Sequence, residues 1–462
     1  MSDLSRLDPT KSDRARYAGL VFDYIESFLA RIPDANGYTT GDFPKLDALR
    51  FGEPKRMEYL LAILRDEVDA VGINTASGRH LGYIPGGGLW TSSLADQLAA
   101  ATNRYAGVAY SNPGSVRIEN QVIEWMCDVV GYPHAAYGNL TSGGSIANLV
   151  GIQAARDEHG INSTNVRDSV IYVSPQTHHC VKKAFHITGL YEAVLRIIPM
   201  DARFRMRADL LRDQIHRDVN DGLNPFLVVA TAGSTDTGAV DPLNDIADVC
   251  DAADCWLHVD GAYGGFFTMV PELHDTFRGL ERSDSLVLDP HKTLFLPYGS
   301  GAVLLRDRER LLASNSTRAN YMKDAYINED ISPSDTGPEL SRHNRALRIW
   351  LPLHLHGVQP FIDELARKRE LCLYFHERVA ELGFETGPDP ELSITIFRVS
   401  GDGDNSETQS LVNRIHEDGR VFMSSTTIDD RLWIRCAIVS HRTERREVDV
   451  ALEMLAELSR HV

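Results

Sequence analysis

The stretch "SLVLDPHKTLFLPYGSGAVLLRD", residues 285–307, places a lysine between two apolar runs that are typical of buried strands. The runs cover 285–288 and 302–305, and the connection between them carries the tetrapeptide DPHK with Lys292. An ammonium group against apolar surface costs free energy unless it is paired or deprotonated. The alternative is that Lys292 lies at a strand end and extends its charged head into solvent. This stretch alone leaves both interpretations open.

Similar strand-like runs recur upstream, from about residue 135. They read "DSVIYVS", "AVLRIIPM", "PFLVVATAG" and "CWLHVDGAY", and helical stretches such as "LNDIADVCDAAD" separate them. This alternation predicts crossover connections and a mainly parallel, buried sheet flanked by helices. In such sheets, ligand groups collect beyond the carboxyl ends of the strands.

The two ends of the chain have a different pattern. Near the N-terminus, "SDRARYAGLVFDYIESFLARI" and "RMEYLLAILRDEVDAVG" carry apolar residues at helical spacing, with Ser12 as a candidate N-cap. Beyond residue 355, a long helical run precedes the strand-like "SITIFRVS" and "RLWIRCAIV". We therefore predict an N-terminal helical segment over 1–78, a large α/β domain over 79–355 and a small C-terminal α/β domain over 356–462.

Composition excludes several classes of function. The 462 residues include 47 Lys and Arg against 65 Asp and Glu, a formal charge of −18 that argues against nucleic acid or an anionic membrane as partner. The six cysteines form no CxxC pair, which favours reduced thiols over disulfides or a metal site. The polar N-terminus does not resemble a secretory signal, and no apolar run approaches the ~20 residues of a membrane span. We expect a cytoplasmic protein.

Four polar motifs follow predicted strands. In "TSGGSIANL", Gly144 and Ser145 stand where a helix begins, a natural cradle for phosphate, although a simple turn has the same residues. The motif "QTHH" carries His178, and a lone histidine is more often structural than catalytic. In "HVDGAYGG", Asp260 ends an apolar run and needs a cation or N–H partner to stay ionised. The fourth motif is DPHK with Lys292.

Each motif is weak alone, but together they predict a site for pyridoxal 5'-phosphate. The aldehyde of this cofactor needs a lysine for a Schiff base, which is the role of Lys292. Its pyridine nitrogen needs a carboxylate to remain protonated, which Asp260 supplies. Its phosphate needs a helix start, and its ring needs a flat partner such as His178.

These motifs, in this order, resemble the group II pyridoxal-phosphate-dependent amino-acid decarboxylases, a family that includes aromatic-L-amino-acid, histidine and glutamate decarboxylases. The similarity extends from about Gly82 to Leu458. It implies a fold-type I architecture and a homodimer, formed with the N-terminal helical segment, whose subunits share their active sites. It also implies that Ala262 packs under the ring, that His291 lies beside the cofactor and that Thr235 lies near ring and substrate.

The resemblance implies decarboxylation of an L-amino acid, with an aromatic one favoured, to the amine and carbon dioxide. Tyr321, in "STRANYMKDAY", matches a loop tyrosine that helps return a proton to the substrate carbon; Tyr326 is an alternative match. Relatives that release aldehyde and peroxide often have phenylalanine there, so oxidative deamination is the first alternative. An aminotransferase is the second, and it would need an arginine for the α-carboxylate, for which only Arg435 is a candidate.

The segment "YIPGGGLW", 83–90, resembles the family segment that lines the substrate pocket. Glycines here either widen that pocket or serve backbone geometry alone. Arg342 is predicted to order the mobile loop or bind the substrate carboxylate, unless it is an ordinary helix-surface arginine. The full set of predicted substrate-binding residues is Tyr83, Ile84, Gly86 and Arg342, with Tyr105 and Gly107 coming from the partner subunit. Asp289 replaces an asparagine that touches the phosphate in relatives, and we expect it to turn away or to stay protonated.

Overall fold

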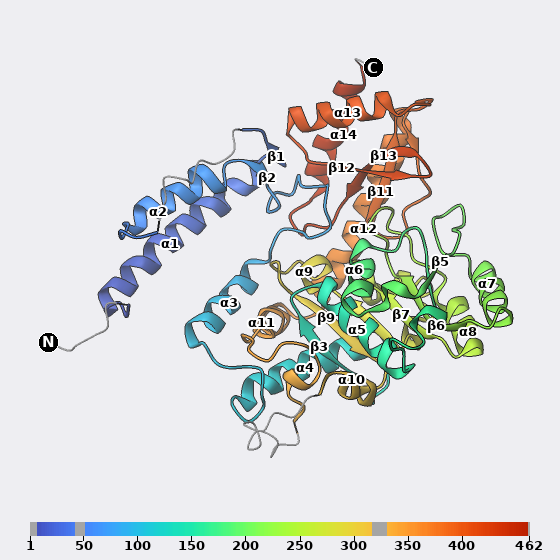
Figure 1. Ribbon diagram of the computed structural model, residues 1–462. Helices are drawn as coiled ribbons and strands as arrows, with labels where there is room; N and C mark the ends of the chain where they lie inside the picture. Colours follow the sequence, from blue (N-terminus) through green and yellow to red (C-terminus); the bar gives the residue numbers. More distant parts are fainter. Residues whose placement is uncertain (1–6, 42–50, 317–329, 461–462) are drawn as a thin grey trace.

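A large α/β domain, a small C-terminal domain and a projecting pair of N-terminal helices make up the protein (Figure 1). The computed structural model describes residues 7–41, 51–316 and 330–460. No helix in these ranges is both long enough and apolar enough to cross a membrane.

The large domain is built on a seven-stranded sheet, as the sequence predicts. In order across the sheet, the strands are β3 (Tyr137–Thr141), β9 (Gly301–Leu305), β8 (Ser285–Leu288), β7 (Trp256–Asp260), β6 (Asn224–Thr231), β4 (Ser169–Val173) and β5 (Val194–Ile197). Pairing is parallel from β8 to β5, and β9 runs antiparallel to both of its neighbours. The mainly parallel sheet is therefore confirmed, and the runs on either side of DPHK are adjacent antiparallel strands.

Helices flank this sheet because parallel strands need crossover connections. They are α3 (Trp90–Thr102), α4 (Pro113–Val129), α5 (Gly144–Glu158), α6 (His179–Ile187), α7 (Ala208–Asn220), α8 (Leu243–Ala253), α9 (Pro290–Thr293), α10 (Arg308–Asn315) and α11 (Leu347–His356). The main hydrophobic core lies between these helices and the sheet, where β7 and β8 are buried along their whole length. The ends of these two strands thus lie deep inside the domain.

The small domain packs three helices on an antiparallel sheet. Its elements are α12 (Gln359–Glu381), β10 (Glu385–Thr386), β11 (Ile394–Arg398), α13 (Ser406–Asp418), β12 (Ser424–Ile428), β13 (Arg431–Ala437) and α14 (Arg445–Ser459). Leu81 joins its core, since the Leu81 N–H donates to Phe422 (2.8 Å) and its carbonyl accepts from Ala437 (2.8 Å). Leu81 thus contacts the small domain, and the division at residues 78/79 and 355/356 stays a prediction.

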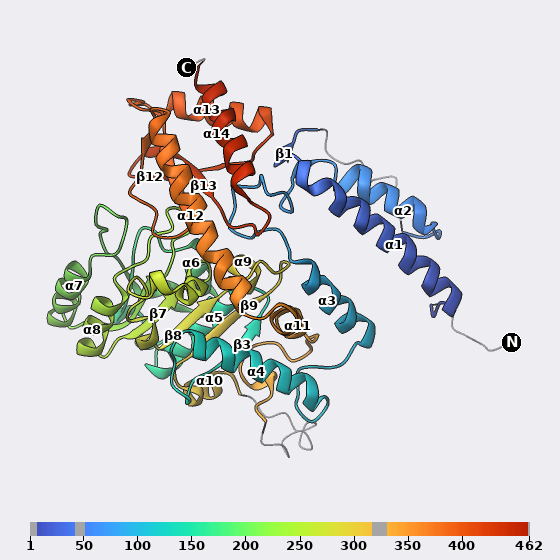
Figure 2. The same cartoon turned by 180° about the vertical axis from the view of Figure 1, so that it is seen from behind.

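The helices of the N-terminal segment project from the main body in both views, while its β1 end is hydrogen-bonded to the small domain (Figures 1 and 2). It comprises α1 (Lys11–Arg31), β1 (Tyr38–Thr39), α2 (Met57–Ile63), a π-helical turn (Leu64–Val68) and β2 (Gly72–Ile73). The N-cap of α1 is Thr10 and not Ser12, because the Thr10 hydroxyl accepts from the Asp13 N–H at 3.2 Å. No residue of α1 is buried within the chain.

Candidate active site

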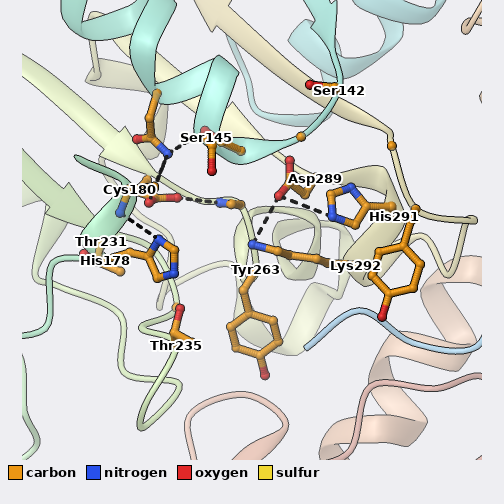
Figure 3. A pocket seen from close by; sticks show the side chains of 18 of the residues that line it. Ser142, Ser145, His178, Cys180, Thr231, Thr235, Tyr263, Asp289, His291 and Lys292 are labelled. Atoms are coloured by element: carbon orange, nitrogen blue, oxygen red, sulfur yellow. Dashed lines mark hydrogen bonds and ion pairs between the residues drawn. The ribbon is translucent and has the colours of Figure 1, made fainter. Parts of the chain in front are cut away.

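A cavity of about 370 Å³ opens beyond the carboxyl ends of the parallel strands (Figure 3). It brings together eight residues that the sequence singled out from separate motifs. They are Gly144, Ser145, His178, Thr235, Asp260, Ala262, His291 and Lys292. Parallel topology is the reason, because each motif follows a strand whose carboxyl end reaches the same edge of the sheet.

Lys292 lies on the short helix α9 and points into this cavity, where its ammonium meets carboxylates (Figure 3). Its Nζ is 3.1 Å from Oδ2 of Asp289. Burial lowers the pKa of Lys292, but the Asp289 and Asp260 carboxylates raise it by more, and the net shift is upward. The lysine is thus partly buried and ion-paired inside the cavity.

Asp260 ends β7 and is held by two donors. Its Oδ1 accepts from the Ala262 N–H (3.1 Å) and its Oδ2 from Nδ2 of Asn148 (3.2 Å). The same Asn148 amide donates to the Gly144 carbonyl at 2.9 Å. Asn148 therefore connects the carboxylate to the first turn of α5.

A directed chain of hydrogen bonds extends behind Asn148. Because Asn148 Nδ2 donates to Asp260, its Oδ1 must accept from Nε2–H of His258 (2.8 Å). Nδ1 of His258 then accepts from the Ser285 hydroxyl (2.7 Å), which itself accepts from Nε1–H of Trp256 (2.8 Å). Burial lowers the pKa of His258 to about 4, consistent with this neutral tautomer. Every donor in the chain points toward Asp260.

The first turn of α5 offers backbone N–H groups to the cavity. No side chain among the described residues caps this helix, whose N-cap is Gly143. A Cβ added at Gly144 would lie 2.8 Å from Oδ2 of Asp289 and 3.2 Å from the Ala262 Cβ. Glycine at this position thus lets the turn approach Asp289 and Ala262 closely. The free N–H groups of the turn and the dipole of α5 suit an anion.

His178 is the N-cap of α6, and Nδ1 of its ring accepts from the Cys180 N–H at 3.3 Å. Burial is the main cause of a lowered pKa for His178. A neutral ring that accepts at Nδ1 carries its hydrogen on Nε2. Beside it, the Thr235 carbonyl accepts from Nε of Arg435 at 2.6 Å, which connects this wall to the small domain.

The predicted substrate-binding residues lie outside the cavity lining of the single chain. Tyr83 is 49% exposed and packs on Phe422, and Ile84 is buried in the main core. A Cβ at Gly86 would lie 2.8 Å from the Ser440 Cα. This glycine permits close approach of the small domain, so the space of its missing side chain is filled by backbone.

Arg342 and the residues predicted to serve the partner's site also lie elsewhere. Arg342 is buried, paired with Glu119 at 2.8 Å, and donates to the Leu140 carbonyl of β3 at 2.9 Å. The Tyr105 hydroxyl donates to the carbonyl oxygen of Leu340 at 3.1 Å. A Cβ added at Gly107 would collide with this same oxygen. Tyr321 and Tyr326 lie outside the described residues.

Several lining residues escaped the sequence analysis. Asp289 was set aside there, yet it faces Lys292 inside the cavity and has not turned away (Figure 3). Asn148 was part of a quoted motif, and a polar residue four positions into an otherwise apolar helix face was the available signal. The others missed are Ser142, Gln176, Cys180, Thr231, Gly233, Tyr263, Tyr298 and Gly299.

The fold and this lysine–carboxylate cavity define a class of enzymes that work with pyridoxal phosphate. The family model described as "Pyridoxal-dependent decarboxylase conserved domain" matches residues 48–400. An aromatic-L-amino-acid decarboxylase of Bacillus atrophaeus is 34% identical over 391 residues, which cover 82% of this chain and 81% of that protein. The chain therefore belongs to the pyridoxal-dependent decarboxylase family. It is an enzyme that decarboxylates an amino acid with pyridoxal phosphate.

Another relative is named for an aldehyde product. The 4-hydroxyphenylacetaldehyde synthase of Rhodiola rosea is 27% identical over 442 residues, covering 92% of this chain and 89% of that protein. A crystal structure of Oryza sativa TDC with PLP and tryptamine superposes with a TM-score of 0.91 at 24% identity, covering 99% of each chain. This last likeness concerns the fold alone.

The residues present fit pyridoxal phosphate. Three cavity-lining atoms are buried without a hydrogen-bond partner among the described residues: Gln176 Oε1, Thr231 Oγ1 and Asp289 Oδ1. Uncompensated buried polar atoms are costly, and a polar ligand would satisfy them. The uncapped turn of α5 suits a phosphate, and Lys292 suits an aldehyde.

Proposed function

We propose that the protein converts an aromatic L-amino acid into its amine and carbon dioxide in the cavity around Lys292. The observation that supports this is the meeting, in one cavity, of Lys292, Asp260 and the uncapped start of α5. The aromatic substrate class is supported by the 34% identity to an aromatic-L-amino-acid decarboxylase.

Bound pyridoxal phosphate supplies an electron-withdrawing ring that takes up the electrons left when carbon dioxide departs. Lys292 would hold the cofactor through its aldehyde. Asp260, whose oxygens accept from Asn148 and the Ala262 N–H, would be the partner of the pyridine nitrogen. The first turn of α5 holds the phosphate.

His178 contributes a flat, neutral ring whose orientation is set by its Nδ1 contact to the Cys180 N–H. We assign it to the face of the cofactor. Tyr321 or Nε2–H of His178 returns a proton to the substrate Cα. Thr235 lies near ring and substrate, Ala262 beneath the ring and His291 beside the cofactor.

The substrate side chain is proposed to meet Tyr83, which is exposed at the junction with the small domain and is backed by the buried rings of Phe422 and His80. The rings of Tyr83 and Phe422 lie 5.5 Å apart, and His80 stacks on Phe422 at 5.9 Å. Ile84 and Gly86 shape this junction from within, and Tyr105 and Gly107 are assigned to the partner's site. Arg342 holds the segment after residue 330 against β3 through its contact to Leu140, a support for loop ordering.

We also propose a cytoplasmic homodimer joined through the N-terminal segment. Apolar side chains of α1, α2 and the π-helical turn after α2 are exposed in the single chain, among them Phe22, Tyr59, Leu64 and Val68. Exposed apolar clusters of this kind mark protein interfaces. All six cysteines are unpaired and buried, which suits a reducing compartment.

Product analysis tests the reaction. Purified, cofactor-loaded protein is offered aromatic, imidazole, acidic, aliphatic and basic L-amino acids, and carbon dioxide, amine, aldehyde and peroxide are measured together. We expect carbon dioxide and amine in equal amounts, with an aromatic substrate turned over fastest. Turnover of another class alone would overturn the substrate assignment.

Oxidative deamination to an aldehyde is the second candidate, because the relatives include aldehyde synthases of Rhodiola rosea and Arabidopsis thaliana. That reaction consumes oxygen and water and releases carbon dioxide, ammonia, peroxide and aldehyde. Tyr321 favours the amine. Peroxide in amounts equal to carbon dioxide would establish the second candidate instead.

A further inference from the structure

Asp289 is the most deeply buried charged residue of the cavity lining, at 1% exposure. It follows β8 and stands before α9, but its side chain does not cap that helix. Its Oδ2 faces Lys292 Nζ at 3.1 Å and His291 Nε2 at 3.9 Å. Its Oδ1 has no hydrogen-bond partner among the described residues. One side of the carboxyl is therefore paired, and the other is not.

The carboxyl also packs against the turn that would receive a phosphate. A Cβ at Gly144 would lie 2.8 Å from Oδ2, and a Cβ at Gly301 would lie 2.7 Å from Oδ1. These contacts place both oxygens beside the backbone that opens α5 and β9. A phosphate bound at this turn, with a charge of about −1.5 to −2, would meet a buried carboxylate at close range. Like charges in a buried site destabilise each other strongly.

The positive charges around Asp289 are too few to neutralise both its carboxylate and a bound phosphate. Lys292 and His291 come from α9, and Cys180 comes from α6, where burial raises its thiol pKa to about 12. Asp260 of β7 adds a second carboxylate on the far side of Lys292, and His178 stands before α6. The facing parts of α5 and β9 are Gly143, Gly144, Ser145 and Gly301, none of which titrates. Lys292 is thus one ammonium for two carboxylates before any phosphate arrives.

We propose that Asp289 takes up one proton from solvent when a phosphate monoester binds at the start of α5, and that its carboxyl then donates this hydrogen to a phosphate oxygen. The proton comes from solvent because the Lys292 ammonium is needed to balance the arriving phosphate. Cofactor affinity in this protein is consequently coupled to pH through Asp289. The inference rests on the proposed placement of the cofactor phosphate.

The test uses pyridoxine 5'-phosphate, which carries the phosphate but has an alcohol in place of the aldehyde and so forms no bond to Lys292. Its binding to the full-length, cofactor-free protein is measured by calorimetry in buffers of different ionisation enthalpy, which gives the number of protons taken up. Asp289→Asn is the matched variant, because an amide keeps the shape and donor of a protonated carboxyl. Asp284→Asn, at the opposite end of β8, is the control.

We expect wild type and Asp284→Asn to take up about one proton more than Asp289→Asn at about pH 8.5, where the phosphate, with pKa near 6, takes up few itself. Above neutrality, affinity of wild type should fall up to about tenfold per pH unit relative to Asp289→Asn. Equal proton uptake by wild type and Asp289→Asn would overturn the proposal. Proton uptake near zero in the wild type would also overturn the proposal. This second outcome can be measured even if the Asp289→Asn variant does not fold.

These outcomes are independent of the reaction. No substrate is present, so a protein that fails the amine and carbon dioxide assay still reports proton uptake at Asp289. Conversely, an active decarboxylase with equal proton uptake in wild type and Asp289→Asn keeps its proposed function and loses this inference.

Discussion

Lys292 shows how one residue in this protein acquires its properties from its neighbours. Desolvation alone would favour its neutral form, but the nearby Asp289 and Asp260 carboxylates reverse the direction of the pKa shift. The structure therefore holds a charged lysine whose position is set by an ion pair at 3.1 Å. A lysine held in this way is positioned before the cofactor arrives.

At the same scale, Tyr321 decides between two products in our proposal. We expect Tyr321→Phe to lower amine formation at least about tenfold, because a proton donor to Cα is worth 10²–10⁴-fold at most sites. Aldehyde and peroxide should rise in its place. The measurement is amine, aldehyde and peroxide per carbon dioxide released. Tyr326→Phe serves as the control, and an unchanged product ratio in Tyr321→Phe would contradict the assignment.

At the scale of elements, β7, β8 and α5 are joined by the hydrogen-bond chain from Trp256 to Asp260. Each strand contributes a link, since Trp256 and His258 lie on β7, Ser285 lies on β8 and Asn148 lies on α5. Gly151 of α5 allows this close packing, because a Cβ there would lie 2.7 Å from the His258 ring. This chain of hydrogen bonds requires a neutral His258, which accepts at Nδ1 and donates from Nε2.

This requirement predicts a pH dependence of stability. The pKa of His258 is lowered to about 4 in the folded protein, below the ordinary 6.5, so its contribution is complete above pH 6.5 and is lost as the pH falls toward 4. The full effect is on the order of 3 kcal/mol, since each pKa unit is worth about 1.4 kcal/mol.

We expect His258→Gln, which keeps a donor but does not titrate, to flatten part of this decline. The measurement is the midpoint of thermal unfolding between about pH 7.5 and about pH 4.5. His216→Gln on α7 is the control, because its exposed ring is hydrated before and after unfolding. A decline in His258→Gln as steep as that of wild type would show that the histidine does not carry the effect.

At the scale of the whole molecule, the N-terminal helices α1 and α2 pack on each other and project from the rest of the chain (Figures 1 and 2). The α1 helix buries no residue, and apolar side chains remain exposed along both helices. A second copy that covers them would explain both facts and would bring its Tyr105 and Gly107 to the neighbouring site. In the proposed homodimer, the shared site makes activity depend on assembly.

We predict that Phe22→Glu combined with Tyr59→Glu yields monomers by light scattering and lowers kcat/KM at least about a hundredfold. Each large apolar side chain buried at an interface contributes about 1.5–3 kcal/mol, and a buried charge adds a further cost. The control is Val219→Glu, since Val219 is 55% exposed against 53% for Phe22 but lies on α7. A dimeric, active double variant would exclude this interface.

The sequence predicted those features of the site that depend on residues close together in the chain, and it missed those that depend on contacts between distant residues. Gly144, His178, Asp260 and Lys292 were found because each stands just after a predicted strand, and parallel strands bring such positions to one edge. Asn148 was missed, because its role depends on contacts to Asp260 and His258, more than a hundred residues away. Gly86 was read as a possible widening of the pocket, yet the Ser440 backbone fills that space.

The sequence by itself determined the parallel α/β architecture, the cofactor and the strand-end residues that meet in one cavity. It could do so because these follow from local periodicity and from short motifs at strand ends. The tertiary structure alone decided that Asp289 faces Lys292, that Arg342 pairs with Glu119 and that the Trp256–Asp260 chain has one direction. Those features depend on which distant side chains share a buried space, where each polar group must find a partner that local sequence does not name.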